Sequence, residues 1–242
     1  LYVSEDNEMF IYDKAVEKID KNGNKEVIIK FKKPISTIFS KGDNLFISFK
    51  HSGLVYHNLK TNKTTDYRKN RLLSRNLPTG ATSFYLEGKK LWLGNDESGL
   101  YEVDVTSIES PKLVQHHTYN KTNPKSFSSS SVSCITKHSG LLFIGTSGDG
   151  FFIYNKKDFT KFSLQDGLPS NNIISFAGSS DSTIWVLTNA GVSFVDWANI
   201  NVSNIGPEEG LGVYLKDQNS LHNIKEGGVL IASPSGVQVV DA

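Results

Sequence analysis

The feature that most constrains this chain is a short pattern that occurs six times along it. Each copy consists of an apolar tetrapeptide, a few turn residues and an alternating strand that often ends in Asp or Asn. Successive copies begin 42 to 51 residues apart, and a period of about 45 residues with several strands per unit is typical of a β-propeller blade. The copies span residues 1–13, 45–58, 91–104, 142–155, 184–196 and 229–241.

Each unit is interpreted as four strands. In the fourth unit, a β-rich segment at 131–136 is followed by strands at 141–145, 151–154 and 159–162. A glycine recurs between the second and third strands, where a tight hairpin requires a positive φ. The first copy has Glu8 there, so we expect its turn to differ. The glycines at this turn are Gly53, Gly99, Gly150, Gly191 and Gly236.

The two ends of the chain differ from its centre. The first unit lacks a recognisable inner strand, and the last supplies three strands but no fourth. We therefore predict an all-β chain over residues 1–242, a β-propeller of four-stranded antiparallel blades with about five blade equivalents. We expect these blades to form part of a larger propeller, and the chain to be a piece of a longer protein.

Motifs in several units resemble the two-component regulator propeller repeat. Residues 166–173 read DGLPSNNI, residues 184–188 read IWVLT, and Gly191-Val192 and Asp196 follow. The segment 119–129, YNKTNPKSFSS, is similar to the Asn-Pro-x-Ser-Leu-Ser linker that precedes such blades. Two further units carry similar residues, LWLG from Leu91 with Gly99-Leu100 and FIGT from Phe143 with Gly150.

The resemblance implies a function as well as a fold. In that family the propellers form the periplasmic sensor of hybrid histidine kinases, commonly tuned to oligosaccharides. The resemblance implies that this chain is a non-catalytic extracytoplasmic sensor segment that binds a carbohydrate-like ligand. The signal of binding is then relayed to a kinase outside the chain. A periplasmic location, in an inner-membrane receptor that dimerises as a whole, belongs to the same implication.

Charge and composition argue against several other classes of function. Lys and Arg total 26 against 25 Asp and Glu, so the net charge of +1 predicts no general attraction to nucleic acid or to an anionic membrane. No stretch approaches the roughly 20 apolar residues of a spanning helix. The single cysteine, Cys134, excludes an internal disulfide and a CxxC-type metal or redox site, and we expect it to be buried.

Candidate ligand-binding residues lie in the connections between units. The three arginines of the chain, Arg68, Arg71 and Arg75, fall within one connection, and guanidinium forks bind carboxylate or sulfate bidentately. A solvated surface loop is the alternative interpretation. Aromatic rings stack on sugars, so Tyr119 and Tyr214, in two other connections, are further candidates.

Other aromatic and histidine residues are interpreted as structural. Trp92 and Trp185 occupy the same repeat position, so we expect them to pack between blades. His116 and His117 are neighbours on a predicted strand, so their side chains should point to opposite faces and should not share a metal. We expect no metal and no cofactor.

Enzyme and scaffold functions remain as alternatives. The sequence contains no serine-hydrolase elbow, HExxH zinc site, phosphate-binding glycine loop or EF-hand pattern. Propellers nevertheless also host lyases and hydrolases with His, Glu or Arg on their loops, and others serve as protein-interaction scaffolds.

Overall fold

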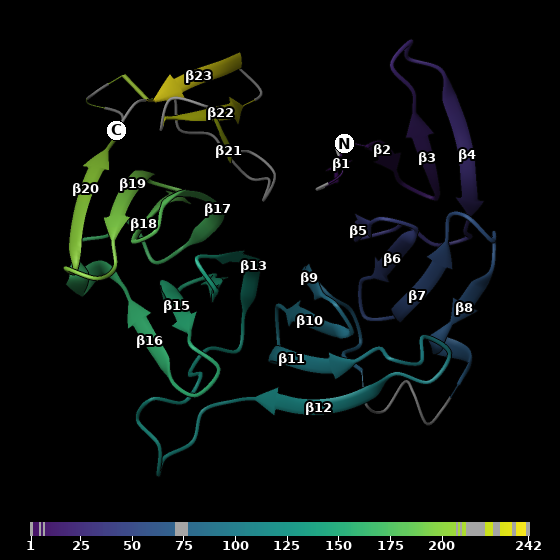
Figure 1. The fold of residues 1–242 in the computed structure, drawn as a ribbon, viewed down its shortest axis with the longest axis horizontal. Coiled ribbons are helices and arrows are strands. Elements are labelled where there is room, and N and C mark those ends of the chain that lie inside the picture. Colours follow the sequence, from purple (N-terminus) through teal and green to yellow (C-terminus); the bar gives the residue numbers. More distant parts are fainter. Residues whose placement is uncertain are drawn as a thin grey trace. The chain divides into compact units, whose positions relative to one another are not determined.

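The computed structural model describes residues 2–4, 6, 8–70, 77–206, 208, 210–211, 221–224, 228–233 and 236–240. The strands of this part form six antiparallel sheets, five with four strands and one with three, and each sheet is a propeller blade (Figure 1). The chain is therefore all-β, as predicted, but the prediction of about five blades is wrong. The helical elements with described bounds are two single 3-10 turns, η1 (Tyr67–Lys69) and η2 (Leu164–Asp166).

The chain divides into two compact units, Leu1–His117 and Thr118–Ala242, with three blades each. Blade 1 contains β1 (Tyr2–Val3), β2 (Met9–Tyr12), β3 (Ala15–Ile19) and β4 (Lys25–Lys30). Blade 2 contains β5 (Thr37–Lys41), β6 (Asn44–Phe49), β7 (Gly53–Asn58) and β8 (Thr64–Asp66). Blade 3 contains β9 (Ser83–Glu87), β10 (Lys90–Asn95), β11 (Gly99–Asp104) and β12 (Lys112–His117).

The second unit continues the same pattern. Blade 4 contains β13 (Val132–His138), β14 (Leu141–Thr146), β15 (Phe151–Tyr154) and β16 (Phe159–Phe162). Blade 5 contains β17 (Ile173–Ser180), β18 (Thr183–Thr188), β19 (Gly191–Asp196) and β20 (Asn201–Ile205). The described residues of blade 6 supply three strands, β21 (Leu221–Asn223), β22 (Val229–Ser233) and β23 (Gly236–Val240).

Blade 1 corrects the prediction that the first unit lacks its inner strand. The Asp6 carboxylate in the β1–β2 turn accepts a hydrogen bond at 2.7 Å from the backbone N–H of Gly42, in the β5–β6 turn of blade 2. The backbone N–H of Ser40 on β5 likewise donates to the Tyr2 hydroxyl on β1, at 3.0 Å. β1 is therefore the counterpart of the first strand β5, and the apolar tetrapeptide at 1–4 is one strand earlier in its blade than predicted.

The error has a physical cause. The outer strands β3 and β4 read AVEKI and KEVIIK, with charged residues on partly exposed positions, so they lack the apolar signature of the other copies. Glu8 accordingly lies in the turn between the first and second strands. Because blade 1 has four strands, the number of blades rises to six.

The predicted glycine turns are confirmed. All five glycines at the turn between the second and third strands have positive φ, from 80° at Gly150 to 155° at Gly191. At Gly150 a Cβ atom would lie 2.0 Å from the carbonyl oxygen of Phe162, so a side chain is excluded by space as well as by φ.

Within each unit, neighbouring blades pack face to face. In blade 2, Ile47 and Val55 belong to the cluster with Phe10 of blade 1, whereas Phe46 and Leu54 belong to the cluster with blade 3. This division follows from the alternation of side chains along a strand.

The prediction that Trp185 packs between blades is confirmed. Trp185 on β18 is 1% exposed and packs in one cluster with Val229 and Ile231 of blade 6. Trp92 on β10 has the same register position and is also buried.

No helix in the described part of the chain is both long enough and apolar enough to cross a membrane.

Candidate functional site

Arg68 and Tyr119, the predicted ligand residues that the structure describes, belong to connections between blades, and topology places these connections at one edge of each sheet. In a four-stranded antiparallel blade, the turn between strands two and three lies at the same edge as the connection after strand four. Backbone hydrogen bonds join the two features: Gly53 N–H donates to Thr79 O at 2.5 Å, and Gly150 N–H donates to Asn171 O at 2.9 Å. We call this edge the link edge of a blade.

Arg68 lies at the link edge of blade 2, in the turn η1 that follows β8. Its Nε and Nη2 atoms donate to the two carboxylate oxygens of Asp66, at 2.7 and 2.8 Å. The guanidinium carbon lies 4.3 Å from the centroid of the Phe49 ring. The Arg68 side chain is 26% exposed and is paired within its own blade rather than extended into solvent.

The electrostatics of the pair follow from this geometry. Burial acts to raise the pKa of the Asp66 carboxyl, but the hydrogen bond and the charge of Arg68 outweigh burial and hold that pKa below its ordinary value. The guanidinium fork is thus satisfied inside its own blade, and a ligand would compete with Asp66 for it.

A small cavity of about 180 Å³ adjoins Arg68 at this link edge. Its walls are formed by residues 51–54, Tyr67, Arg68 and residues 77–79. The Tyr67 hydroxyl donates to Ile108 O at 2.8 Å, and burial raises the pKa of Tyr67 well above its ordinary value. Tyr67 therefore contributes a structural wall. Arg71 and Arg75 belong to the same connection but lie outside the described residues.

The two tyrosine candidates differ in what the structure describes. Tyr119 is 63% exposed, in the connection after β12, where the backbone N–H of Asn120 donates to Ser126 Oγ at 2.9 Å. Its ring is accessible for stacking. Tyr214 lies outside the described residues. Arg68 belongs to the first unit and Tyr119 to the second, so they stay separate candidates whose role in binding is a prediction.

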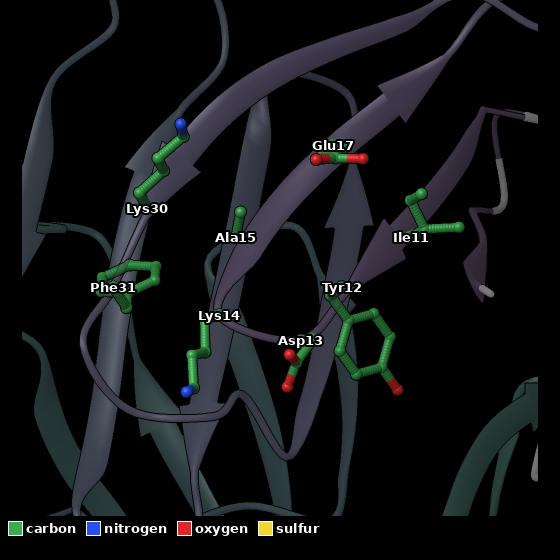
Figure 2. A pocket seen from close by; sticks show the side chains of 8 residues that line it. All are labelled: Ile11, Tyr12, Asp13, Lys14, Ala15, Glu17, Lys30 and Phe31. Atoms are coloured by element: carbon green, nitrogen blue, oxygen red, sulfur yellow. The ribbon is translucent and has the colours of Figure 1, made fainter.

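A larger cavity, which the sequence did not indicate, lies at the link edge of blade 1. It measures about 410 Å³ and is lined by residues 11–15, Glu17, Lys30 and Phe31 (Figure 2). Like the cavity at Arg68, it is bounded by the turn after the second strand and by the start of the connection after the fourth. The sequence did not indicate it because residues 1–4 and 9–12 were predicted to be the second and third strands of the blade, whereas they belong to the first and second.

Blade 3 contains a buried polar cluster. Glu102 on β11 is 6% exposed and forms an ion pair with Lys90, and its carboxylate lies 3.5 Å from Nε2 of His117. The His117 ring stacks on Trp92 with centroids 5.5 Å apart, and burial lowers the pKa of His117. His116 instead stacks on Tyr101, so the prediction that the two histidines face opposite sides of the sheet is confirmed.

Cys134 on β13 is a buried thiol, as predicted. It is 5% exposed, and burial raises its pKa to about 12. The thiolate is therefore not accessible near neutral pH, and Cys134 is not a reactive cysteine.

Comparison of the sequence with known proteins gave no match: no protein-family model and no curated protein matches this chain.

Several solved structures nevertheless share its fold. The extracellular domain of BT3049 from B. thetaiotaomicron, assigned to the hybrid two-component systems, superposes with a TM-score of 0.73 at 17% identity, over 99% of this chain and 33% of that one. The corresponding domain of BT4673 from the same organism gives 0.71 at 14% identity, over 100% and 31%. This chain therefore spans about a third of the length of either domain.

A computationally designed protein, Ika8, also matches, with a TM-score of 0.66 at 12% identity, over 97% of this chain and 67% of that one. Identities this low establish the propeller fold alone. Because a designed protein shares the fold, the architecture by itself does not specify a function.

Proposed function

We propose that this chain is a non-catalytic sensor segment of an extracytoplasmic receptor. It binds a carbohydrate-like ligand, and the signal of binding is relayed to a kinase outside the chain. The observation that carries the proposal is the fold shared over 99% of the chain with the extracellular domain of BT3049. A periplasmic location and dimerisation through the full receptor belong to the same proposal.

The state of the titratable groups supports binding rather than catalysis. Catalytic acids and bases are expected where a shifted pKa coincides with an accessible cavity. In the described residues the shifted groups with some burial are committed to structural contacts: Asp66 pairs with Arg68, His117 with Glu102, and the hydroxyl of Tyr67 with a backbone carbonyl. Among the residues that the structure describes, no such group supports the competing interpretation, a propeller lyase or hydrolase.

The experiment that tests the proposal is calorimetric titration of the chain with a panel of oligosaccharides, followed by chromatography of each sugar after prolonged incubation. We expect at least one oligosaccharide to bind and to be recovered unchanged. Cleaved products would favour the enzyme interpretation instead. If no sugar of the panel bound, the carbohydrate proposal would be contradicted and a protein-interaction scaffold would be favoured.

A further inference from the structure

We propose that the cavity at the link edge of blade 1 is the ligand site of this chain and that it takes a neutral oligosaccharide. This inference rests on the proposed function and specifies its site and its class of sugar. The cavity of about 410 Å³ lies within the range of roughly 300 to 1,000 Å³ that is typical of small-molecule sites, whereas the cavity of about 180 Å³ beside Arg68 lies below it.

The first support is the charge of Glu17, which stands at a position of the third strand that is uncharged in the other described blades. Glu17 pairs in register with Ile11, as Val55 pairs with Ile47 in blade 2. Val55 is fully buried against blade 1. A carboxylate at such a position does not serve packing, and departures from a local rule of this kind are expected at functional sites. In the other described blades this position is uncharged: Val55, Tyr101, Phe152, Ser193 and Gln238.

The second support is that the carboxylate of Asp13 is available. Asp13 directly follows β2, and its N–H donates to Ala15 O as that of Thr146 donates to Gly150 O in blade 4. Thr188 holds the same position in blade 5, opposite Gly191. Those threonines bond to their own turns: Thr146 Oγ1 donates to Gly150 O at 2.6 Å, and Thr188 Oγ1 donates to Gly191 O at 2.9 Å. The Asp13 carboxylate makes no such bond within the described part of the chain.

The four charged side chains of the cavity suit a ligand that both donates and accepts hydrogen bonds. Asp13 and Glu17 are acceptors, Lys14 and Lys30 are donors, and no ion pair joins these four to one another in the described structure. Figure 2 shows Glu17 on the same side of the sheet as Ile11, with Lys30 at the opposite end of the cavity. Sugar hydroxyls donate and accept, so one ring can satisfy both kinds of group.

The balance of charge selects the class of sugar. Two carboxylates and two ammonium groups sum to zero, so the cavity offers no net attraction to an anionic glycan, and Asp13 and Glu17 would repel its carboxylates. The side chains of Ile11 and Ala15 provide an apolar surface on which the C–H face of a neutral ring can pack.

The test is calorimetric titration of the chain with neutral xylo-, manno-, cello- and malto-oligosaccharides, an acidic oligogalacturonide and a cationic chitosan oligomer. For a neutral sugar that binds, Glu17→Gln is expected to weaken affinity roughly tenfold or more, the effect of losing a hydrogen bond to a charged group. Asp13→Asn should act similarly. Glu26→Gln is the matched control, because Glu26 is exposed on the same sheet and does not line the cavity.

A second variant separates binding from packing. Glu17→Val installs the residue of blade 2, so it should keep or raise the melting temperature while weakening binding at least as much as Glu17→Gln. Unchanged affinity in both Glu17 variants would overturn this inference and leave the proposed function intact. Preferential binding of the acidic or the cationic oligomer would overturn the assignment to neutral sugars. If none of the sugars bound, the site and the proposed function would both be contradicted.

Discussion

Arg68 is held on two sides by its own blade. Asp66 accepts two hydrogen bonds from the guanidinium, and the ring of Phe49 lies beneath it. The ring of Phe31, from the connection that leaves blade 1, is 5.8 Å away. The side chain therefore links the end of one blade to the end of the next, and its loss should be felt in stability.

We expect Arg68→Gln to lower the free energy of unfolding by roughly 1 to 3 kcal/mol, the scale of a charge-assisted hydrogen bond whose partner is left partly buried. Urea titration measures the change. Lys69→Gln is the control, because Lys69 is exposed and its substitution should change stability by less than about 0.5 kcal/mol. Equal effects of the two changes would show that Arg68 is not structural.

The same pair predicts a dependence on pH. The pKa of Asp66 is lower in the folded chain than in the unfolded chain, so the unfolded chain binds more protons in acid and the contribution of the pair is lost as the pH falls. The stability difference between the unmodified chain and Arg68→Gln should therefore be constant near neutral pH and should shrink below about pH 4, the ordinary range of an aspartate. A difference that persists to pH 2 would contradict this account.

Neighbouring blades meet through a few close contacts between strands. In the second unit, His138 on β13 reaches β17 of the next blade, where its Nε2 lies 2.5 Å from Ser180 O and its ring packs edge-on against Trp197. Gly178 on β17 leaves room for this ring: a Cβ there would lie 2.2 Å from His138 Nδ1.

We expect Gly178→Ala to destabilise the chain by roughly 1 to 3 kcal/mol, because the added methyl group displaces the His138 ring from a packed interface. A double-mutant cycle with His138→Ala tests the cause. In the His138→Ala background, Gly178→Ala should lower the free energy of unfolding by a much smaller amount. An undiminished cost in that background would place the strain in the backbone of β17 rather than in the contact between blades.

Trp185 supplies the largest side chain of the interface between blades 5 and 6. It is 1% exposed and packs with Leu187, Val229 and Ile231. Trp185→Ala should lower the free energy of unfolding by roughly 3 to 5 kcal/mol, the usual range for a buried aromatic residue. Val114→Ala, on the exposed strand β12, is the control, and its effect should be small. A loss below about 1 kcal/mol at Trp185 would contradict the packing role.

At the scale of the whole molecule, the dependence of stability on pH involves two histidines of the first unit, of which His57 is buried and His117 is partly buried. His57 is 2% exposed, with Nδ1 2.8 Å from Thr64 Oγ1, and His117 lies beside Glu102. Burial lowers the pKa of both imidazoles. The unfolded chain therefore binds more protons than the folded chain below about pH 6.5.

We expect the urea midpoint to fall as the pH is lowered from 7.5 to 5.0, because the folded state resists protonation of His57 and His117. The variants His57→Gln and His117→Gln should each flatten this profile, whatever they do to stability at pH 7.5. His222→Gln is the control, since His222 is exposed on β21. A profile that keeps its full slope in both buried-histidine variants would assign the pH dependence to other groups.

The sequence by itself determined the repeat and its internal order. Alternating apolar residues and a glycine before the third strand act locally, so they predict strands and turns wherever they occur, as at Gly150. The burial of Trp185 could be predicted for the same reason, because its position in the repeat fixes the face of the sheet on which it lies.

Only the tertiary structure decided the register of blade 1, the commitment of Arg68 and the position of the larger cavity. β1 is identified as a first strand by its contacts with β5, from Tyr2 to Ser40, and no local pattern encodes a pairing over that distance. Phe49, which packs under Arg68, is likewise far from it in the sequence. The cavity forms where residues 11–15 meet Lys30 and Phe31, and the pairing of Glu17 with Ile11 places a charge where blade 2 has Val55.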